Sequence, residues 1–144
     1  MIPPQILDDE VSFKLYTLNR LIQQAYGAYL MPLQLTYPQY LVMKILLEED
    51  HVPVNVISAK LHLESNTVTP LLQRMEKLGL LWREKKCEDH RQRIILLTEQ
   101  GRNMRNDIEQ VSALVAESLS EQKLDCMMAN GLRDMLNEFI SRIR

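Results

Sequence analysis

A chain of 144 residues with 46% hydrophobic content is long and apolar enough to form one folded domain, which excludes a disordered protein. Its four glycines and six prolines leave few residues for the turns of an all-β fold, so we expect a mainly α domain. The net charge of −2 argues against a nucleic-acid partner, but residues 65–93 carry seven basic and four acidic side chains, so positive charge is concentrated in one segment.

The N-terminal part of the chain predicts two helices. Apolar residues recur at alternating spacings of four and three from Val11 to Tyr29, which is the pattern of a long amphipathic helix. Pro38 suits the first turn of the next helix, with Thr36 as its cap. That helix is apolar nearly all round over residues 40–47, so we expect it to be buried.

The next segment predicts a helix-turn-helix. Residues 53–61 and 67–78 form two short helical patterns separated by His62-Leu63-Glu64, and Ser65 or Asn66 suits the cap of the second helix. The apolar and small positions that the motif needs are Ile57, Ser58, Leu61, Leu63, Val68 and Leu71, with Leu63 filling the turn. The sequence departs from the motif at the turn position, where glycine is common and this chain has His62. Histidine can still adopt the positive φ of this position at modest cost. Other pairs of packed helices show a similar apolar set, so the motif is only moderately specific.

After Gly79 the pattern changes to a β-hairpin, with strands over 80–85 and 93–97 and a polar tip over 87–92. A second helix that leads into a basic hairpin is the architecture of a winged helix, in which this helix lies in the major groove and the wing follows the DNA backbone. The candidate DNA contacts of the helix are Ser65, Asn66, Thr67, Thr69, Gln73 and Arg74. In the wing we expect Lys85, Lys86 and Arg93 to neutralise phosphates and Arg91 to enter the narrower groove. Asp89 either holds the Arg91 guanidinium or is an ordinary turn residue.

The C-terminal part predicts two further helices. The first begins near Thr98, where Thr98-Glu99-Gln100-Gly101 offers a cap, and continues to about Ser118. The second follows Ser120, and its apolar side is formed by Leu124, Met128, Leu132, Met135, Leu136, Phe139 and Ile143.

The sequence has no signal for a metal site, a cofactor or a membrane segment. Its two cysteines, Cys87 and Cys126, are far apart and lack metal-ligand spacing. No apolar run approaches the ~18 residues that span a bilayer, and the first residues have no basic stretch followed by an apolar one. We therefore expect a cytoplasmic protein with no metal, no cofactor and no membrane contact.

The sequence resembles the multiple-antibiotic-resistance regulator (MarR) family of bacterial winged-helix repressors. The stretches that carry this resemblance are residues 61–72, residues 74–80, Asp89-His90-Arg91 and residues 97–101. The resemblance covers nearly the whole chain and implies a single MarR-type domain over residues 1–144. It implies dimerisation helices in residues 5–34 and 98–144 and a winged-helix DNA-binding region in residues 35–97. The implied protein is a homodimer that binds double-stranded DNA at a pseudo-palindromic operator and regulates transcription, as a repressor.

Two stretches, Phe13-Lys14-Leu15-Tyr16 and Thr36-Tyr37-Pro38-Gln39-Tyr40, resemble the organic-hydroperoxide-sensing branch of that family. In that branch a reactive cysteine precedes the Phe, and its oxidation releases DNA; here the position holds Ser12. The resemblance implies a sensor pocket in which Tyr26 and Tyr37 hydrogen-bond the thiolate, while Tyr16 reaches in from the partner subunit. Serine does not form a sulfenic acid, so residue 12 of this chain should not sense peroxide.

Several interpretations stay open at this stage. Either Ser12 replaces a native sensing cysteine, or the natural protein responds to another effector, such as a small molecule. Cys126 fits a buried structural thiol or a resolving partner, and Cys87 fits a bystander or a thiol whose modification disturbs DNA binding. A winged helix can also serve as a protein-interaction module. An enzyme is the poorest class, because His51, His62 and His90 have no nucleophile or paired carboxylate at a suitable spacing and no Gly-rich phosphate loop exists.

Overall fold

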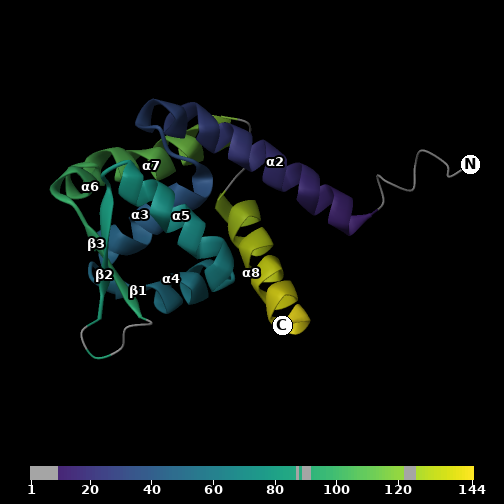
Figure 1. The fold of residues 1–144 in the computed structure, drawn as a ribbon. Coiled ribbons are helices and arrows are strands. Elements are labelled where there is room, and N and C mark those ends of the chain that lie inside the picture. The colour runs from purple at the N-terminus through teal and green to yellow at the C-terminus, as the bar shows by residue number, and fades with distance from the viewer. Residues whose placement is uncertain (1–9, 87, 89–91, 122–125) are drawn as a thin grey trace, which may run out of the picture.

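The computed structural model describes residues 10–86, 88, 92–121 and 126–144. The described helices and strands follow in the order α2 (Val11–Leu30), η1 (Met31–Leu33), α3 (Tyr37–Glu48), β1 (Val52–Pro53), α4 (Val54–Leu61), α5 (Ser65–Lys77), β2 (Leu81–Lys85), β3 (Arg93–Leu97), α6 (Glu99–Asn103), α7 (Arg105–Glu121) and α8 (Cys126–Ile143) (Figure 1). Helices dominate and the strands form one small sheet, so the predicted mainly α fold with a β wing is confirmed.

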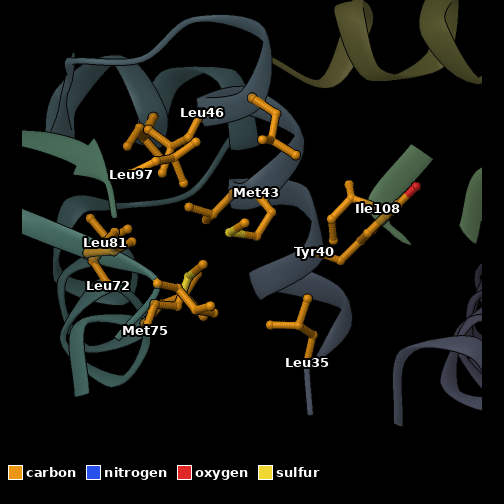
Figure 2. Close-up of a cluster of buried hydrophobic side chains, with 14 of the residues drawn as sticks. Leu35, Tyr40, Met43, Leu46, Leu72, Met75, Leu81, Leu97 and Ile108 are labelled. Carbon is orange, nitrogen blue, oxygen red and sulfur yellow. The ribbon is translucent and has the colours of Figure 1, made fainter. Parts of the chain in front are cut away.

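Helix α3 forms the centre of the core, as its apolar pattern predicts. Thr36 caps it: the Thr36 Oγ1 accepts a hydrogen bond from the Gln39 N–H, and the Gln39 Oε1 accepts one from the Thr36 N–H at 2.9 Å. The buried side chains of α3 meet those of α5, the strands and α7, including Tyr40, Val42, Met43, Leu46, Leu72, Met75, Leu81, Ile95, Leu97 and Ile108 (Figure 2). This apolar core joins the elements that carry the candidate site.

Helices α4 and α5 form the predicted helix-turn-helix, with two corrections. His62 ends α4 at φ 56°, as expected for the turn position. Leu63 does not fill the turn, because its side chain is 40% exposed. Neither Ser65 nor Asn66 is the cap of α5: Glu64 is, since its carbonyl accepts hydrogen bonds from the N–H groups of Thr67 and Val68, and the helix begins at Ser65.

The sheet contains one strand more than the sequence predicts. Its order is β1-β3-β2, and both pairs are antiparallel. In the hairpin, Leu81 lies opposite Leu97, Arg83 opposite Ile95, and Lys85 opposite Arg93. The short strand β1 pairs Val52 with Ile95, which joins the start of the helix-turn-helix to the wing.

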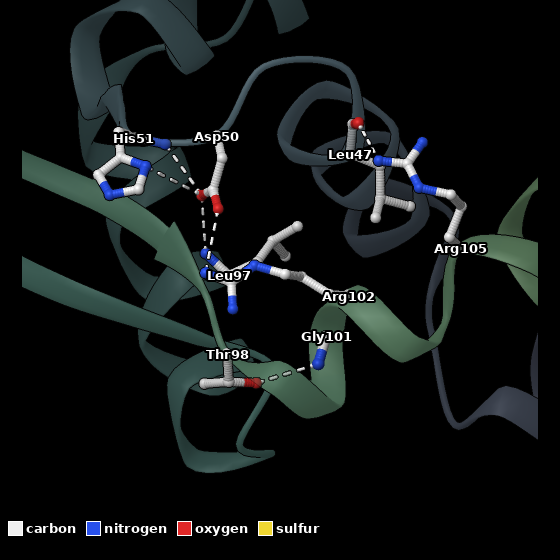
Figure 3. Close-up of polar contacts among 8 residues, drawn as sticks. All are labelled: Leu47, Asp50, His51, Leu97, Thr98, Gly101, Arg102 and Arg105. Atoms are coloured by element: carbon white, nitrogen blue, oxygen red, sulfur yellow. Dashed lines mark hydrogen bonds and ion pairs between the residues drawn. The ribbon is translucent and has the colours of Figure 1, made fainter.

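Asp50, in the turn after α3, connects the wing to the C-terminal helices (Figure 3). Its Oδ1 accepts hydrogen bonds from the N–H groups of Leu97 and His51, both at 2.9 Å, and the guanidinium of Arg102 lies 3.4 Å from its Oδ2. The sequence predicts one helix over residues 98–118, but the structure divides it into α6 and α7 at Met104. Arg102 is on α6, so the carboxylate joins the end of β3 to the start of the C-terminal region.

The Asp50 carboxylate predicts a pH dependence of stability. Its partial burial acts to raise the pKa, but the N–H groups of Leu97 and His51, the His51 ring and Arg102 together outweigh this and lower it. A carboxyl whose folded-state pKa is lowered contributes stability above its unfolded pKa of about 4 and loses that contribution as the pH falls further. Asp50→Asn should therefore be less stable than wild type near neutral pH, and the gap should shrink below about pH 4.

Urea unfolding followed by circular dichroism from pH 3 to 7 measures this gap. Asp134→Asn on α8 removes an exposed carboxylate and controls for the loss of one charge. A stability gap for Asp50→Asn that does not change with pH would contradict this role of the carboxylate.

The N-terminal helix α2 and the C-terminal helices α7 and α8 expose apolar side chains that a folded monomer normally buries. Those exposed on α2, α7 and α8 are Val11, Tyr16, Leu21, Leu114, Leu132, Met135, Phe139, Ile140 and Ile143. In Figure 1 the start of α2 projects outward from the body that contains the helix-turn-helix. None of the described helices is both long and apolar enough to cross a membrane.

Candidate nucleic-acid interface

Helix α5 has one apolar face and one polar face. Val68, Leu71, Leu72 and Met75 are buried against the core. The opposite side carries the predicted contacts: Ser65, Asn66, Thr67, Gln73 and Arg74 are exposed, and Thr69 is half-buried. The Thr69 hydroxyl donates to the Ser65 carbonyl at 2.9 Å, and that of Thr67 lies 3.5 Å from the Asn66 amide oxygen. The exposed face is thus polar and held mainly by contacts within its own helix.

The wing has one face that is apolar at its base and cationic towards its tip. Side chains directly opposite each other in an antiparallel pair share a face, so Leu81 and Leu97, Arg83 and Ile95, and Lys85 and Arg93 lie on the same side. Leu81, Ile95 and Leu97 are buried, whereas Lys85 is exposed and Arg93 half-buried. Two cations therefore face each other across the hairpin, which is an unfavourable pairing for the folded chain.

The wing carries further residues besides this opposed pair of cations. Lys86 is exposed, and its N–H closes the hairpin on the Gln92 carbonyl at 3.1 Å. The predicted minor-groove residue Arg91 and its supporting Asp89 lie outside the described residues. Trp82 is on the opposite face of β2 from the cations and is 59% exposed, across from Leu96.

An ion pair that the sequence analysis missed joins the wing to α5. The Glu76 carboxylate accepts hydrogen bonds from the Arg83 backbone N–H at 3.2 Å and from the Arg83 Nε at 2.8 Å. Both side chains are partly shielded from solvent, with 25% and 30% of their surface exposed for Arg83 and Glu76. The sequence places Arg83 only within the basic segment of residues 65–93. The signal that marks it is its alternation with Leu81, which places it on the inward face of the strand.

A groove separates the start of α5 from the wing. It encloses about 270 Å³ and is lined by Val54, Asn55, Ser65, Thr69, Leu72, Arg83, Gln92 and Arg93. The structure thus brings three of the predicted residues, Ser65, Thr69 and Arg93, together with Arg83. Gln73, Arg74, Lys85 and Lys86 are not among the residues that line this groove.

The predicted sensor residues separate into two groups within one chain. Tyr26 and Tyr37 pack edge to face with ring centroids 4.8 Å apart, and both contact Tyr40. Burial and then the neighbouring tyrosines raise the pKa of Tyr26 and Tyr37, so their hydroxyls remain protonated donors at neutral pH. Ser12 and Tyr16 are exposed near the start of α2, and Ser12 is about 21 Å along the helix from Tyr26 at 1.5 Å per residue. A single chain does not bring Ser12 to the two half-buried tyrosines.

The two cysteines contribute little to this picture. Cys87 lies outside the described residues, and Cys126 is the first residue of α8. Among the described residues, no three His, Cys, Asp or Glu side chains are grouped so that they could hold a metal ion.

A helix-turn-helix followed by a β-wing, with a polar outer face and opposed cations, defines a winged-helix protein of the DNA-binding type. The family described as transcriptional regulator SarA/Rot matches residues 24–108 of the chain. The chain belongs to this family, which has the MarR-type winged-helix fold. The predicted DNA-binding transcription regulator is thereby confirmed.

Three relatives place the chain more closely. It is 35% identical to the HTH-type transcriptional regulator TtmR of Methylorubrum extorquens, over 93% of this chain and 71% of the relative. It is 40% identical to the organic hydroperoxide resistance transcriptional regulator of Bacillus subtilis, over 66% of this chain and 65% of the relative. Its fold matches reduced AbfR bound to DNA, a protein of Staphylococcus epidermidis, with a TM-score of 0.80, 32% identity and 99% coverage of both chains. The disulfide form of AbfR matches with a TM-score of 0.68, 32% identity and coverage of 94% of this chain and 93% of that one.

Proposed function

We propose that the protein is a homodimeric repressor that reads a pseudo-palindromic operator with α5 and holds the DNA backbone with its wing. The observation that carries this proposal is the cationic face of the wing beside the open polar face of α5. Lys85 directly opposite Arg93 costs the folded protein stability, so this pairing is favourable only when an anion such as a phosphate lies between or over the two side chains. Ser65, Asn66, Thr67, Thr69, Gln73 and Arg74 then face base edges and phosphates in the major groove.

Dimerisation uses the N- and C-terminal segments of the chain, residues 5–34 and 98–144. The apolar side chains exposed on α2, α7 and α8 supply a self-complementary surface of the kind that two-fold dimers bury. The higher TM-score with reduced, DNA-bound AbfR than with its disulfide form supports a conformation competent for DNA. The dimer places two copies of α5 about 34 Å apart, one turn of the DNA helix. The protein performs no catalysis and acts in the cytoplasm, where bacterial DNA is found.

Selection of bound duplexes from a random pool, followed by fluorescence anisotropy on the winning sequence, tests this function. We expect an inverted repeat with half-site centres one helical turn apart, and log K should fall linearly with log salt by about 0.9 per phosphate contact. Arg91→Ala should weaken operator binding, whereas a protein-interaction module would be indifferent to this change. A pool that yields no inverted repeat, or an affinity that salt does not alter, would count against the repressor.

The dimer also provides an effector pocket. Helix α2 is about 30 Å long, so two α2 helices that cross in opposite directions bring the start of one to the end of the other. Ser12 of one subunit then meets Tyr26 and Tyr37 of the other. Tyr16, one turn after Ser12 on the same helix, enters this pocket together with Ser12 and not from the opposite subunit as the resemblance implies. Protonated phenols and a serine hydroxyl bind the polar group of a small organic effector, and a cysteine at position 12 converts the same pocket into a hydroperoxide sensor.

Ser12→Cys is expected to make operator binding sensitive to organic hydroperoxide. Oxidation of a thiolate to a sulfenic acid gives a reactive polar group next to the tyrosines, and DNA should be released at least tenfold more readily after treatment with cumene hydroperoxide. Anisotropy before and after peroxide, with Ser12→Ala as the matched variant, measures this. The natural Ser12 and the alanine variant should not respond through this site, and a cysteine variant that stays fully bound after oxidation would remove position 12 from the regulatory pocket.

A further inference from the structure

Three polar contacts join α7 to α3, and two of them lie at matching intervals on the two helices. The Arg105 guanidinium donates to the Leu47 carbonyl at 2.6 Å (Figure 3), and the Tyr40 hydroxyl hydrogen-bonds the Ser112 hydroxyl. Arg105 and Ser112 are seven residues apart on α7, and Leu47 and Tyr40 are seven residues apart on α3 in the opposite direction. The two helices are thus connected at both ends of a stretch of two turns, about 10 Å long.

These hydrogen bonds add directional restraints to the apolar packing between α7 and α3. Ile108 and Val111 of α7 are buried between the two polar contacts (Figure 2 shows Ile108 beside Tyr40). Apolar burial is non-directional, so hydrogen bonds at defined positions add a directional restraint on how far one helix slides along the other. A displacement of one residue along the axis, about 1.5 Å, shifts both contacts by the same amount because their spacing is the same on both helices, so the two hydrogen bonds lengthen together.

In each contact, a polar group of α3 needs the hydrogen bond that α7 provides. The Leu47 carbonyl is among the last four of α3, which have no partner within the helix, and an arginine at a helix C-terminus satisfies such a carbonyl and is favoured by the dipole. Tyr40 is only 1% exposed, so its hydroxyl depends on Ser112, and the Lys44 Nζ donates to the same Ser112 Oγ at 3.3 Å. Near Arg105, Arg102 holds Asp50, which fixes the end of β3.

We propose that Arg105 and Ser112 are positioning residues that fix the register of α7 on α3 and thereby specify the spacing between the two operator half-sites. This inference rests on the proposed dimeric repressor, because α7 and α8 lead to the dimer surface while α3 carries the helix-turn-helix. Because the two contacts lie about 10 Å apart, they restrain rotation of α7 on α3 as well as sliding. A domain of this size has a lever of roughly 20 Å, so a rotation of about 10° at the α3–α7 contact moves α5 by about 3.5 Å, the rise of one base pair. The position of α7 on α3 therefore sets the number of base pairs between the two half-sites that the dimer binds.

The test compares the affinities for three duplexes: the selected operator, and the same half-sites moved apart or together by one base pair. The variant combines Tyr40→Phe, which removes only a hydroxyl, with Arg105→Gln, and Arg144→Gln at the end of the chain is the charge-matched control. Wild type and control should lose at least tenfold in affinity per shifted base pair. The double variant should lose at most threefold, while its dimer remains intact by analytical ultracentrifugation. An unchanged spacing penalty in the double variant would overturn the proposal.

If the double variant does not fold, the single variants Tyr40→Phe and Arg105→Gln serve in the same comparison.

A second measurement needs no DNA. Nitroxides at Lys77→Cys, in a background with Cys87→Ser and Cys126→Ser, report the distance between the two copies of α5 by double electron–electron resonance. The distance distribution should at least double in width in the Tyr40→Phe, Arg105→Gln variant, and an unchanged distribution would also overturn the proposal. If wild type binds no operator at all, the repressor function fails, and this measurement still decides the role of the two contacts.

Discussion

Replacing Lys85 and Arg93 together by glutamine is expected to weaken operator binding by about tenfold to a hundredfold while leaving the protein as stable as wild type or slightly more stable. The two side chains lie opposite each other in the hairpin, so their repulsion is relieved in the free protein. In the complex, loss of two phosphate contacts lowers the affinity and reduces the slope of log K against log salt by about 2. Anisotropy titrations at four salt concentrations and urea unfolding of the free protein measure both effects.

The opposite signs of the two effects make this prediction specific. Arg133→Gln on α8 with Arg144→Gln, the residue after that helix, removes the same charge and should change neither the salt slope nor the hairpin's stability by a comparable amount. Equal affinity and an equal salt slope for wild type and the wing variant would contradict a backbone-binding wing. A loss of stability in the wing variant would show that the two cations support the fold instead.

The substitution with the largest expected effect on folding is Gly101→Ala. A Cβ at this buried position would lie 2.2 Å from the Leu80 carbonyl oxygen and 3.0 Å from the Leu97 Cδ2. The Leu80 carbonyl cannot move away freely, because it accepts the Thr98 N–H at 3.1 Å, and the Thr98 Oγ1 in turn accepts the Gly101 N–H at 3.0 Å. We expect a loss of about 3 kcal/mol in the free energy of unfolding, at the upper end for an overpacked core.

Gly27→Ala is the matched control for that change. Gly27 is also helical, on α2, and a Cβ there would meet no described atom within 4 Å. The same substitution should therefore stabilise the protein by about 0.5–1 kcal/mol, because alanine is the better helix former. Urea midpoints at constant m value compare the two variants. Two glycine variants of similar stability would contradict the close approach of α6 to Leu80.

The elements that the sequence predicts correctly are those whose signals are local. Helix α3, the helix-turn-helix and the hairpin follow from periodicity, from the Thr36 cap and from Gly79, all of which act within a few residues. Strand β1 escapes prediction because two residues have no periodicity, and they become a strand only by pairing with β3. The sequence predicts that α5 begins at residue 67, but it begins at Ser65 because the Glu64 backbone carbonyl caps it, and no side chain reveals such a cap.

The candidate site divides in the same way. The polar residues of α5 and the cations of the wing belong to elements that follow each other in the sequence. The helical period places the former on one face of α5, and the strand period places the latter on one face of the wing. The Glu76–Arg83 ion pair depends on how the wing folds back on α5, and the Arg105–Leu47 contact depends on a backbone carbonyl. The resemblance implies a sensor pocket to which the partner subunit contributes, and within one chain the length of α2 keeps Ser12 far from Tyr26. A pocket that is completed by a second subunit is not encoded in any local pattern of one chain.

Trp82 is the single tryptophan of the chain, and it is largely exposed on the face of the wing away from the cations. Its emission therefore comes from the wing alone. The protein carries a built-in optical probe at the element that is proposed to meet the DNA backbone, so the wing can be followed in real time without a chemical label, separately from events in the dimer helices.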